Sequence, residues 1–477
     1  MSSSTIKRII SLYNLNYEKS LCYMLQRTNY DVHKFLKWYL RFPNFQKVNV
    51  RGELKKTLAS KSILIGLRFI RVTITVFSIY LILSSRNISL GVGLLLLSPL
   101  IQVLILIPTL PLIRSLLIVP SQNKAISKAE KIFMDSKAIK IVILGSYGKT
   151  TVKELLANVL SSKYKVAYTH DNLNTQIAHS RFAQKLKGDE DFIIVELGEE
   201  KPGDIAKMAS VIHPDYAIVT GMAPVHLDHM KSIEAISDDL SSILNFVDKE
   251  NIFWNKDSEY LNNHIGKSLA PRNAYSTNSA LNNRISHIDA TLINGVSFKL
   301  NDTTFKTRFV GRHLIPSLAL MVTLGEKFEI PTDLLKDRIK EAQPFSARMQ
   351  VVKVGPAHVI NDGYNGNIEG IQAGISTLSE LKASGKKLYA TPGLIAQGNQ
   401  NDEVHRKIAL LLSKTNFDLV YLFENKNTKI IQAELKRLKS DIRVELVKNP
   451  LEFLENLHSF LANGDVLLIQ NDLPDEA

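Results

Sequence analysis

The most apolar part of the chain lies within its N-terminal quarter. Residues Ile88 to Ile113 include no charged side chain, and a helix of that length spans roughly 39 Å at ~1.5 Å per residue, more than the ~30 Å hydrocarbon layer of a bilayer. The preceding run, Ile63 to Ser85, reaches crossing length only if Arg68 and Arg71 extend toward the lipid headgroups. The pattern predicts an α-helical membrane hairpin, and it leaves open whether the first segment crosses.

Basic residues flank this hairpin on both sides. By the positive-inside rule, both ends then lie in the cytoplasm, and so does everything after Arg114. The residues before the hairpin show mixed helical spacing and predict short amphipathic helices, in which the apolar positions are Leu21, Met24, Leu25, Phe35, Leu36, Trp38, Tyr39 and Leu40. Core packing and docking at the membrane interface both explain these positions.

After a polar segment around Ser121 to Lys137, taken as a linker, the pattern changes to alternating strands and helices. Apolar runs typical of buried parallel strands are Ile139 to Leu144, Phe192 to Leu197 and Tyr216 to Thr220, with a helical stretch from Gly203 to Ile212. Asp289 to Val310 alternates around Asn-Gly and Asn-Asp turns, which predicts a small antiparallel excursion.

Another layered α/β part follows from about Gly311. Its expected helices are Ile368 to Leu381, Val404 to Leu412, Ile430 to Leu438 and Leu451 to Leu461; its expected strands are Lys387 to Thr391, Leu419 to Phe423, Val444 to Val447 and Val466 to Gln470. His405 is expected on a helix surface. We therefore predict three parts: an anchor at residues 1–120, a central α/β domain at 121–310 and a C-terminal α/β domain at 311–477.

Composition narrows the class of protein. A chain of 477 residues exceeds one hydrophobic core, and 45% hydrophobic residues exclude a wholly disordered chain. The single cysteine, Cys22, leaves no cysteine cluster for zinc or iron and sulfur. The net charge of +13 is compatible with nucleic acid, but the basic residues gather around the hairpin, so we favour anionic lipid of the inner membrane over nucleic acid as the partner.

The strand ending at Leu144 leads directly into the segment Gly145-Ser146-Tyr147-Gly148-Lys149-Thr150-Thr151 and then into a helical stretch, Val152 to Leu160. A strand, a glycine turn and a helix in this order form a phosphate cradle, or P-loop, because glycines let backbone N–H groups approach the phosphates. Lys149 can neutralise phosphate charge, and Thr150 can offer its hydroxyl to Mg²⁺. The segment is shorter than the full P-loop pattern, since Ile143 stands where that pattern has glycine.

Two further residues are expected beside this turn. Glu196 ends one predicted strand and His226 follows another, so both belong at the carboxyl edge of the sheet, where ligands bind in such folds. Together they are candidates for a metal site. Taken singly, Glu196 is better explained by a solvated strand end, and His226 by a helix cap or a core histidine.

These residues resemble the Mur ligase family, the ATP-dependent amide ligases of peptidoglycan synthesis. The resemblance rests on the glycine turn and on later segments in the same order: Asn174-Thr175, Glu196-Leu-Gly198, Gly203-Asp-Ile205, Pro224-Val-His226-Leu-Asp228, Gly311-Arg-His313, Arg348, Asp362-Gly-Tyr-Asn-Gly-Asn367 and Thr391-Pro-Gly-Leu394. The Tyr364-Asn365 segment is most similar to the branch that adds D-alanyl-D-alanine. The stretch from Met24-Leu-Gln26 to Lys37-Trp38, placed before the hairpin, resembles a membrane-anchored subgroup of that branch.

The resemblance implies an α/β fold with a P-loop central ATPase domain and a Rossmann-like C-terminal domain. It implies ATP and Mg²⁺ as cofactors. Residues 145–151, Arg348 and Asp362 would bind the nucleotide, while Thr150, Glu196 and His226 would hold metal. Lys149, Glu196, His226 and Arg348 would be catalytic, and the substrate-side residues would be Asn174, Thr175, Tyr364 and Asn365.

The sequence also departs from the family pattern. Family members usually carry a modified lysine about fourteen residues after the histidine, and here that region reads Ser237-Asp-Asp-Leu-Ser-Ser-Ile243. Asp238 or Asp239 could supply the missing negative charge, or the pair could simply be acidic residues at a helix N-terminus. Ser317 stands near the place of the family's adenine-contacting asparagine, and Ala396-Gln397 replaces an acidic pattern.

Two functional hypotheses follow. The first is a membrane-anchored ligase that activates an acceptor carboxylate as an acyl phosphate and joins it to an amino acid or D-alanyl-D-alanine. Because the anchor stands where soluble relatives bind UDP, the muramyl-peptide acceptor could be UDP-linked or lipid-linked. The second hypothesis is a catalytically weakened homologue that acts as a membrane-bound scaffold in wall assembly. The sequence does not indicate an oligomeric state.

Overall fold

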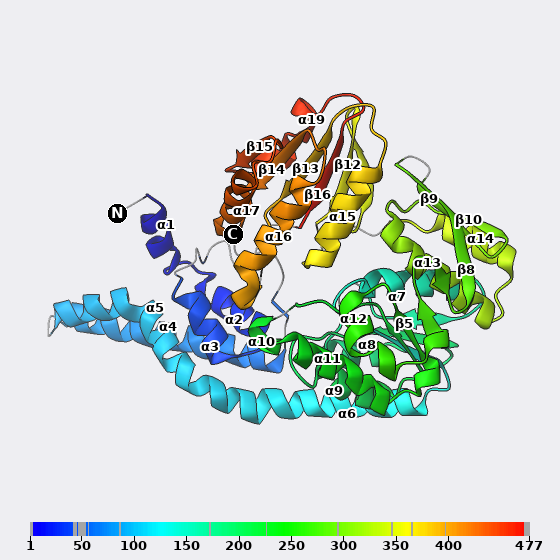
Figure 1. Cartoon of the computed structure of the whole chain (residues 1–477). Helices are drawn as coiled ribbons and strands as arrows, with labels where there is room; N and C mark the ends of the chain where they lie inside the picture. Colours follow the sequence, from blue (N-terminus) through cyan, green and yellow to red (C-terminus); the bar gives the residue numbers. More distant parts are fainter. Residues whose placement is uncertain are drawn as a thin grey trace. The chain divides into compact units, whose positions relative to one another are not determined.

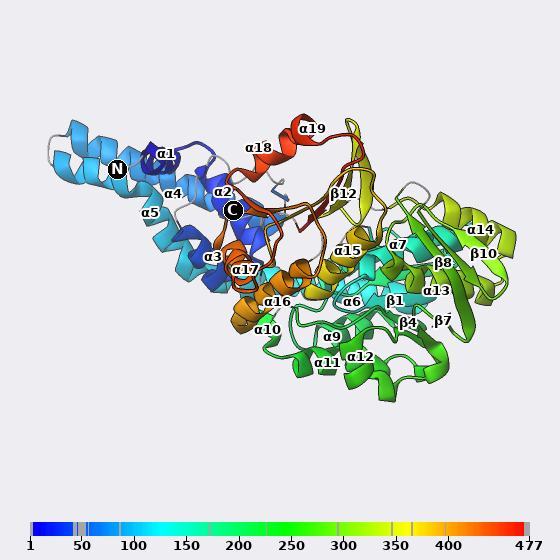
Figure 2. The ribbon, with the colours of Figure 1, turned by 45° about the horizontal axis from the view of Figure 1, so that its top comes forward.

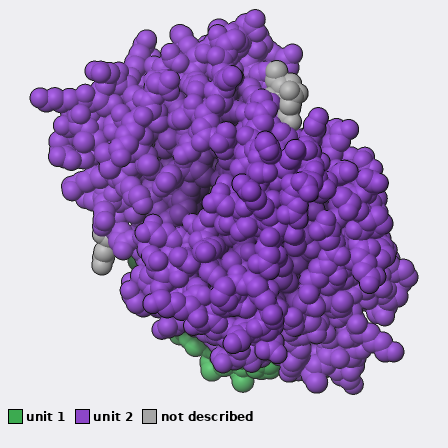
Figure 3. Space-filling model, turned by 45° about the vertical axis from the view of Figure 1, so that its right-hand side comes forward, with its two compact units in different colours: residues 1–125 green, residues 126–477 purple. Residues whose placement is uncertain are grey.

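The computed structural model describes residues 3–41, 45, 54–55, 57–84, 87–170, 173–225, 227–292, 295–344, 347–363, 366–395 and 397–471. The chain divides into two compact units, Met1–Ala125 and Ile126–Ala477 (Figure 3). Each unit has its own buried core, so each is described by itself.

The first unit is helical (Figure 1). Its helices are α1 (Ser3–Ser11), α2 (Tyr17–Arg27), α3 (Val32–Tyr39), α4 (Leu58–Leu83), α5 (Ile88–Ile113), a π-helical turn at Arg114–Ile118, and the start of α6 (Val119–Asp135). Helices α4 and α5 pair along their length as the predicted hairpin. Three prolines lie inside α5, at Pro99, Pro108 and Pro111, without ending it.

The short helices pack onto this hairpin. Tyr17, Leu21 and Leu25 of α2 and Phe35 of α3 are fully buried in one cluster with residues of α4 and α5. This confirms core packing for most of their apolar positions, whereas Leu40 stays exposed. An ion pair between half-buried Arg71 and buried Glu18 ties α2 to α4, since Arg71 Nε lies 2.7 Å from Glu18 Oε1.

Two helices among the described residues are long and apolar enough to cross a bilayer, one at Leu58–Leu83 and one that continues from Ile88 to Asp135. Large apolar side chains remain exposed along both, with Phe69 at 71%, Leu83 at 78% and Leu104 at 69%. The helix α6 corrects one expectation. The segment around Ser121 to Lys137 is a helix and not a linker, because Ala129 and Phe133 form an apolar stripe that packs on the second unit's core.

The second unit begins with a mixed sheet, in the order β10-β9-β8-β7-β6-β5-β4-β1-β3-β2 within the described residues. Its strands β2, β3, β1, β4, β5 and β6 are parallel, and β6 to β10 are antiparallel. Their bounds are β1 (Ile139–Leu144), β2 (Val166–Tyr168), β3 (Phe192–Glu196), β4 (Tyr216–Val219), β5 (Ile252–Asn255), β6 (Ala274–Tyr275), β7 (Ser279–Ala280), β8 (Asn283–Thr291), β9 (Gly295–Leu300) and β10 (Thr303–Lys306).

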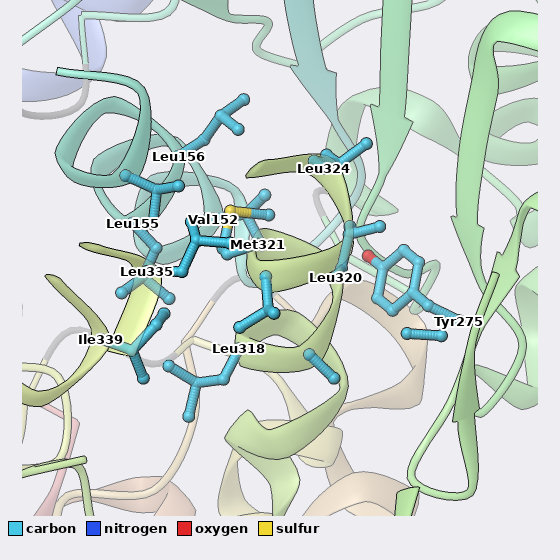
Figure 4. Close-up of a cluster of buried hydrophobic side chains, with 14 of the residues drawn as sticks. Val152, Leu155, Leu156, Tyr275, Leu318, Leu320, Met321, Leu324, Leu335 and Ile339 are labelled. Atoms are coloured by element: carbon cyan, nitrogen blue, oxygen red, sulfur yellow. The ribbon is translucent and has the colours of Figure 1, made fainter. Parts of the chain in front are cut away.

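Helices cover both faces of this sheet. One face carries α7 (Lys149–Leu160), α13 (Ile315–Lys327) and α14 (Thr332–Glu341), whose side chains interlock in a buried cluster (Figure 4). The other face carries the end of α6 and the helices α8 (Gln176–Ala183), α9 (Asp204–Ile212), α11 (Ile233–Ser241) and α12 (Glu259–His264). The short α10 (Leu227–Met230) precedes α11. Both faces are buried, which explains why the parallel strands are almost wholly apolar.

A second sheet has the order β11-β12-β16-β13-β14-β15 and is parallel except for β11. Its strands are β11 (Gln350–Val354), β12 (Ala357–Asp362), β13 (Lys387–Thr391), β14 (Leu419–Phe423), β15 (Val444–Val447) and β16 (Val466–Gln470). Helices α15 (Ile368–Glu380), α16 (Asn401–Ser413) and α17 (Lys426–Arg437) cover one face, and α18 (Pro450–Glu455) and α19 (Leu457–Phe460) the other (Figure 2).

In the first sheet, strand β1 pairs with β3 on one side and β4 on the other. The chain passes from β1 to β2 and β3 on one side and then crosses to β4 on the other, so the strand order reverses at β1. Ligands of open α/β sheets bind at such a point, beyond the carboxyl ends of the strands. The predicted glycine turn follows β1 directly and therefore lies at this position.

Candidate active site

The glycine turn after β1 has a conformation that glycine permits. Gly145 has φ of +130° and Gly148 of +75°, and a Cβ on Gly145 would lie 2.6 Å from Thr220 Oγ1. The N–H of Ser146 donates to Gly221 O at 2.8 Å, which ties the turn to the end of β4. Gly148 precedes α7 and offers no side-chain cap. The first N–H groups of α7 thus keep the arrangement that binds anions.

The first two residues of α7 contact acidic side chains at the end of β3 and just beyond it. The ammonium group of Lys149 donates to Gly145 O, and its Nζ lies 3.4 Å from Glu199 Oε1. The hydroxyl of Thr150 donates to Glu196 Oε2 at 2.8 Å. The turn and the strand end that the sequence predicted as neighbours are therefore in direct contact.

Glu196 is surrounded by donors. Lys153 Nζ lies 3.2 Å from Glu196 Oε2, and Asn174 Nδ2 donates to Oε1 at 3.4 Å. The backbone of Glu196 is held as well, because its N–H donates to Thr169 Oγ1 at 3.1 Å and its carbonyl bonds His179 Nε2 at 2.8 Å. This carboxylate is fixed in place by both its main chain and its side chain.

Burial shifts the pKa of several groups around the turn. It raises the pKa of the Glu199 carboxyl, and the neighbouring Lys149 ammonium opposes that shift. It raises the pKa of Tyr147 to about 12 and lowers the pKa of His179 to about 4. The site at neutral pH therefore contains a protonated phenol and a neutral imidazole.

Asp239 and Asp238 take different positions. Asp238 is exposed, whereas Asp239 is buried within α11 and its Oδ1 accepts a hydrogen bond from the N–H of Gly203 at 2.7 Å. Burial raises the pKa of Asp239 to about 6. Asp239 thus supports the start of α9 and not the start of its own helix.

Residues of the second sheet were predicted to reach the nucleotide. Asp362 ends β12 and is buried, where it accepts hydrogen bonds from the N–H of Met349 at 3.1 Å and from Gln470 Nε2 at 2.8 Å. Arg348 is half-buried on the segment before β11, between Ala347 and Met349, which both have positive φ. A nucleotide-binding role for either residue stays a prediction.

The structure describes only some of the other predicted site residues. Thr175 caps α8, since its hydroxyl accepts from the N–H of Ala178 at 3.4 Å, and Thr151 is buried in the first turn of α7. His226, Tyr364 and Asn365 lie outside the described residues. Within the described ranges, no three histidine, cysteine or acidic side chains are grouped as a preformed metal cluster.

Sequence reasoning missed two charged residues of this site. Lys153 is fully buried, and its position one helical turn after Lys149 could have placed it on the same face of α7. Glu199 is 4% exposed and follows Glu196 by three residues. The sequence feature that could have indicated Glu199 is a second carboxylate just beyond the end of the predicted strand.

The segment after β13 corrects the expectation for His405. This histidine is buried and not on the surface: its Nε2 accepts from the N–H of Leu394 at 3.0 Å, and its Nδ1 bonds Asn401 O at 2.6 Å. Asn427 Nδ2 donates to Leu394 O at 2.8 Å, and Asn471 Nδ2 donates to Gly393 O at 3.1 Å. These side chains hold in place the segment Thr391-Pro-Gly-Leu394, which resembles a segment of the Mur ligase family.

Two family domains match the chain: the Mur ligase middle domain at residues 143–323 and the Mur ligase glutamate ligase domain at residues 347–470. The chain belongs to the Mur ligase family. The matched ranges contain the glycine turn, Glu196 and the whole second sheet.

Individual relatives agree with this assignment. The chain is 21% identical to the UDP-N-acetylmuramoyl-tripeptide--D-alanyl-D-alanine ligase of Bacillus subtilis over 76% of this chain and 80% of that protein. It is 25% identical to the ligase of the same name from Buchnera aphidicola, over 74% and 76% of the two chains. The crystal structure of MurF ligase from Thermotoga maritima in complex with ADP has the same fold, with a TM-score of 0.64, 21% identity and coverage of 74% and 80%.

Proposed function

We propose that this Mur ligase family member is an ATP-dependent, ADP-forming ligase of peptidoglycan precursor synthesis. The carboxylate of a muramyl-peptide acceptor takes the γ-phosphoryl group of ATP and becomes an acyl phosphate, and ADP leaves. The amine of D-alanyl-D-alanine then attacks the acyl carbon, an amide bond forms and phosphate leaves. One observation supports this chemistry above the others. The hydroxyl of Thr150, at the start of α7, donates to the carboxylate of Glu196, at the end of β3, at 2.8 Å beside the glycine turn.

The nucleotide would bind at residues 145–151, the P-loop of the central domain. Lys149 would neutralise phosphate charge, which is the main demand of phosphoryl transfer. A Mg²⁺ ion fits these residues, because the Thr150 hydroxyl and the Glu196 carboxylate are hard oxygen ligands, and His226 belongs to the same proposed set. When bound, Mg²⁺ would supply charge stabilisation for the transferred group.

The C-terminal part would complete the site as a Rossmann-like domain. In this proposal Arg348 and Asp362 approach the nucleotide, while Asn174, Thr175, Tyr364 and Asn365 contact the substrates. The domain closes after ATP and acceptor have bound, which excludes water from the reactive acyl phosphate. The division into residues 1–120, 121–310 and 311–477 belongs to the same proposal, with α13 and α14 at the start of the last range packed on the first sheet.

We also propose that α4 and α5 anchor the chain in the cytoplasmic membrane, with both α/β parts in the cytoplasm. Exposed apolar side chains run along both helices, among them Phe69, Leu83 and Leu104, and burying them in lipid removes apolar area from water. Basic residues on either side would meet anionic headgroups.

The experiment that tests the function uses the full chain in lipid nanodiscs. ATP, Mg²⁺ and D-alanyl-D-alanine are supplied with either a UDP-linked or a lipid-linked muramyl tripeptide, and products are identified by mass spectrometry. We expect ADP release that depends on acceptor and a product heavier than the acceptor by one dipeptide, with the UDP-linked acceptor as the substrate named for the relatives. Use of the UDP-linked acceptor alone would refute the lipid-linked alternative.

The scaffold hypothesis is not favoured. A weakened homologue has no need of Lys149 at the glycine turn or of the Thr150 contact with Glu196, yet both are retained. Binding of ATP without any acceptor-dependent ADP release would reverse this preference.

A further inference from the structure

Glu199 is a buried carboxylate whose hydrogen bonding is incomplete. Its side chain is 1% exposed, and its Oε1 lies 3.4 Å from Lys149 Nζ. The Ser146 hydroxyl and the Gly145 N–H are near enough to lower the pKa of this carboxyl, yet its Oε2 makes no hydrogen bond. A buried carboxylate oxygen without a partner is costly, and buried charges are normally paired or bound to a metal. The unsatisfied oxygen therefore points to a ligand that completes the site.

The position of Glu199 indicates which kind of ligand can bind its unpartnered oxygen. Lys149 is shared between the Gly145 carbonyl and the Glu199 carboxylate. A phosphate group that reaches Lys149 thus arrives next to a carboxylate, and two negative groups at close range in a poorly solvated site repel each other. A divalent cation between them removes the repulsion, because Mg²⁺ prefers carboxylate and phosphate oxygens.

The positive charge of Lys153 is not available to balance Glu199. Lys153 pairs with Glu196, which also accepts hydrogen bonds from Thr150 and Asn174. Asp239 adds to the excess, since it lies close enough to Glu199 for the two charges to interact, and its own Oδ2 has no partner. Glu199 Oε2 and Asp239 Oδ2 are therefore two buried carboxylate oxygens without a hydrogen-bond partner, on residues whose charges repel each other.

We propose that Glu199 is a ligand, directly or through water, of the divalent cation that accompanies the nucleotide, and that it makes nucleotide binding depend on this cation. The inference rests on the proposed function only for nucleotide binding at residues 145–151. It adds a metal-binding carboxylate to Thr150 and Glu196.

The test measures binding of fluorescently labelled ADP to the full chain in nanodiscs, in EDTA and in Mg²⁺. For Glu199→Gln we expect metal-free affinity to rise by about tenfold, because one negative charge beside the phosphate is removed, while the gain on adding Mg²⁺ shrinks by a similar factor. Mn²⁺ retained by the protein and ADP complex, measured by electron paramagnetic resonance, should fall. Glu199→Asp keeps the charge and should keep most of the Mg²⁺ dependence.

Glu200→Gln is the matched control, because Glu200 is the exposed neighbour with the same charge, and it should bind like the wild type. The melting temperature of each variant establishes that it is folded. An equal loss in EDTA and in Mg²⁺, or no change, for folded Glu199→Gln would overturn the proposal while leaving the proposed function intact. A wild-type chain that binds ADP under neither condition would overturn both.

Discussion

Replacing Lys153 by methionine tests the charge arrangement under the glycine turn. Lys153 is completely buried, and the Glu196 side chain 3.2 Å away is 2% exposed, so solvent does not screen the pair. Removing one partner of a buried ion pair costs about 3 to 5 kcal/mol, because the other charge stays buried without compensation. Thr150 and Asn174 still donate to Glu196 in the variant, so we expect about 3 kcal/mol, the lower end of that range.

The assay is urea unfolding followed by tryptophan fluorescence. The chain has two tryptophans, and Trp254 lies buried on β5 of the central sheet. A Trp38→Phe background leaves Trp254 as the reporter of the unit that contains Lys153. The change in midpoint, multiplied by the slope of the transition, gives the change in unfolding free energy.

Two further variants make the result specific. Glu196→Gln added to Lys153→Met removes both charges and should recover at least about 1 kcal/mol, because a neutral replacement of a buried pair is often tolerated. Lys336→Met breaks an exposed pair with Asp333, 3.3 Å apart and 43% and 94% exposed, and should cost at most about 0.5 kcal/mol. If Lys153→Met costs less than about 1 kcal/mol, or if Glu196→Gln restores nothing, the reasoning from burial is wrong.

Three other predictions concern the turn and the second sheet. Lys149→Ala should abolish acceptor-dependent ADP release while the protein stays folded and membrane-bound, with a lower melting temperature because Glu199 loses its partner; full activity in that variant would argue against the phosphate assignment. Gly145→Ala should weaken ADP binding by tenfold or more on the ~1 to 3 kcal/mol cost of a strained backbone, because its Cβ would lie 2.6 Å from Thr220 Oγ1; unchanged binding would contradict the fixed turn. Burial lowers the pKa of His405 below its ordinary 6.5, so its contribution to stability is present above about pH 6.5 and is lost as the pH falls. Thermal unfolding between pH 7 and pH 5 should show this loss, and His405→Asn should reduce the slope without removing it, because burial also lowers the pKa of His179 and His313; equal slopes would refute the assignment.

Strand positions were predictable from the sequence where both faces of a strand are buried. Lys387–Thr391 and Leu419–Phe423 have the predicted bounds, because a short, mainly apolar run between turn residues favours a buried strand. The helix α6 was missed for the opposite reason. Its exposed face is polar, so the sequence suggested a linker. Only the packing of Ala129 and Phe133 in the core of the second unit shows that the helix has a buried apolar stripe.

The sequence by itself determined the order of most elements, the apolar hairpin, and the glycine turn from Gly145 to Thr151 between a strand and a helix, because these depend on neighbours along the chain. Tertiary structure decided which charges meet. Glu199 contacts Lys149, and Lys153 contacts Glu196, only because β3 pairs with β1 and brings its carboxyl end against the start of α7. Strand order depends on pairing between segments that are distant in the chain, and the local periodicity of the sequence does not determine that pairing.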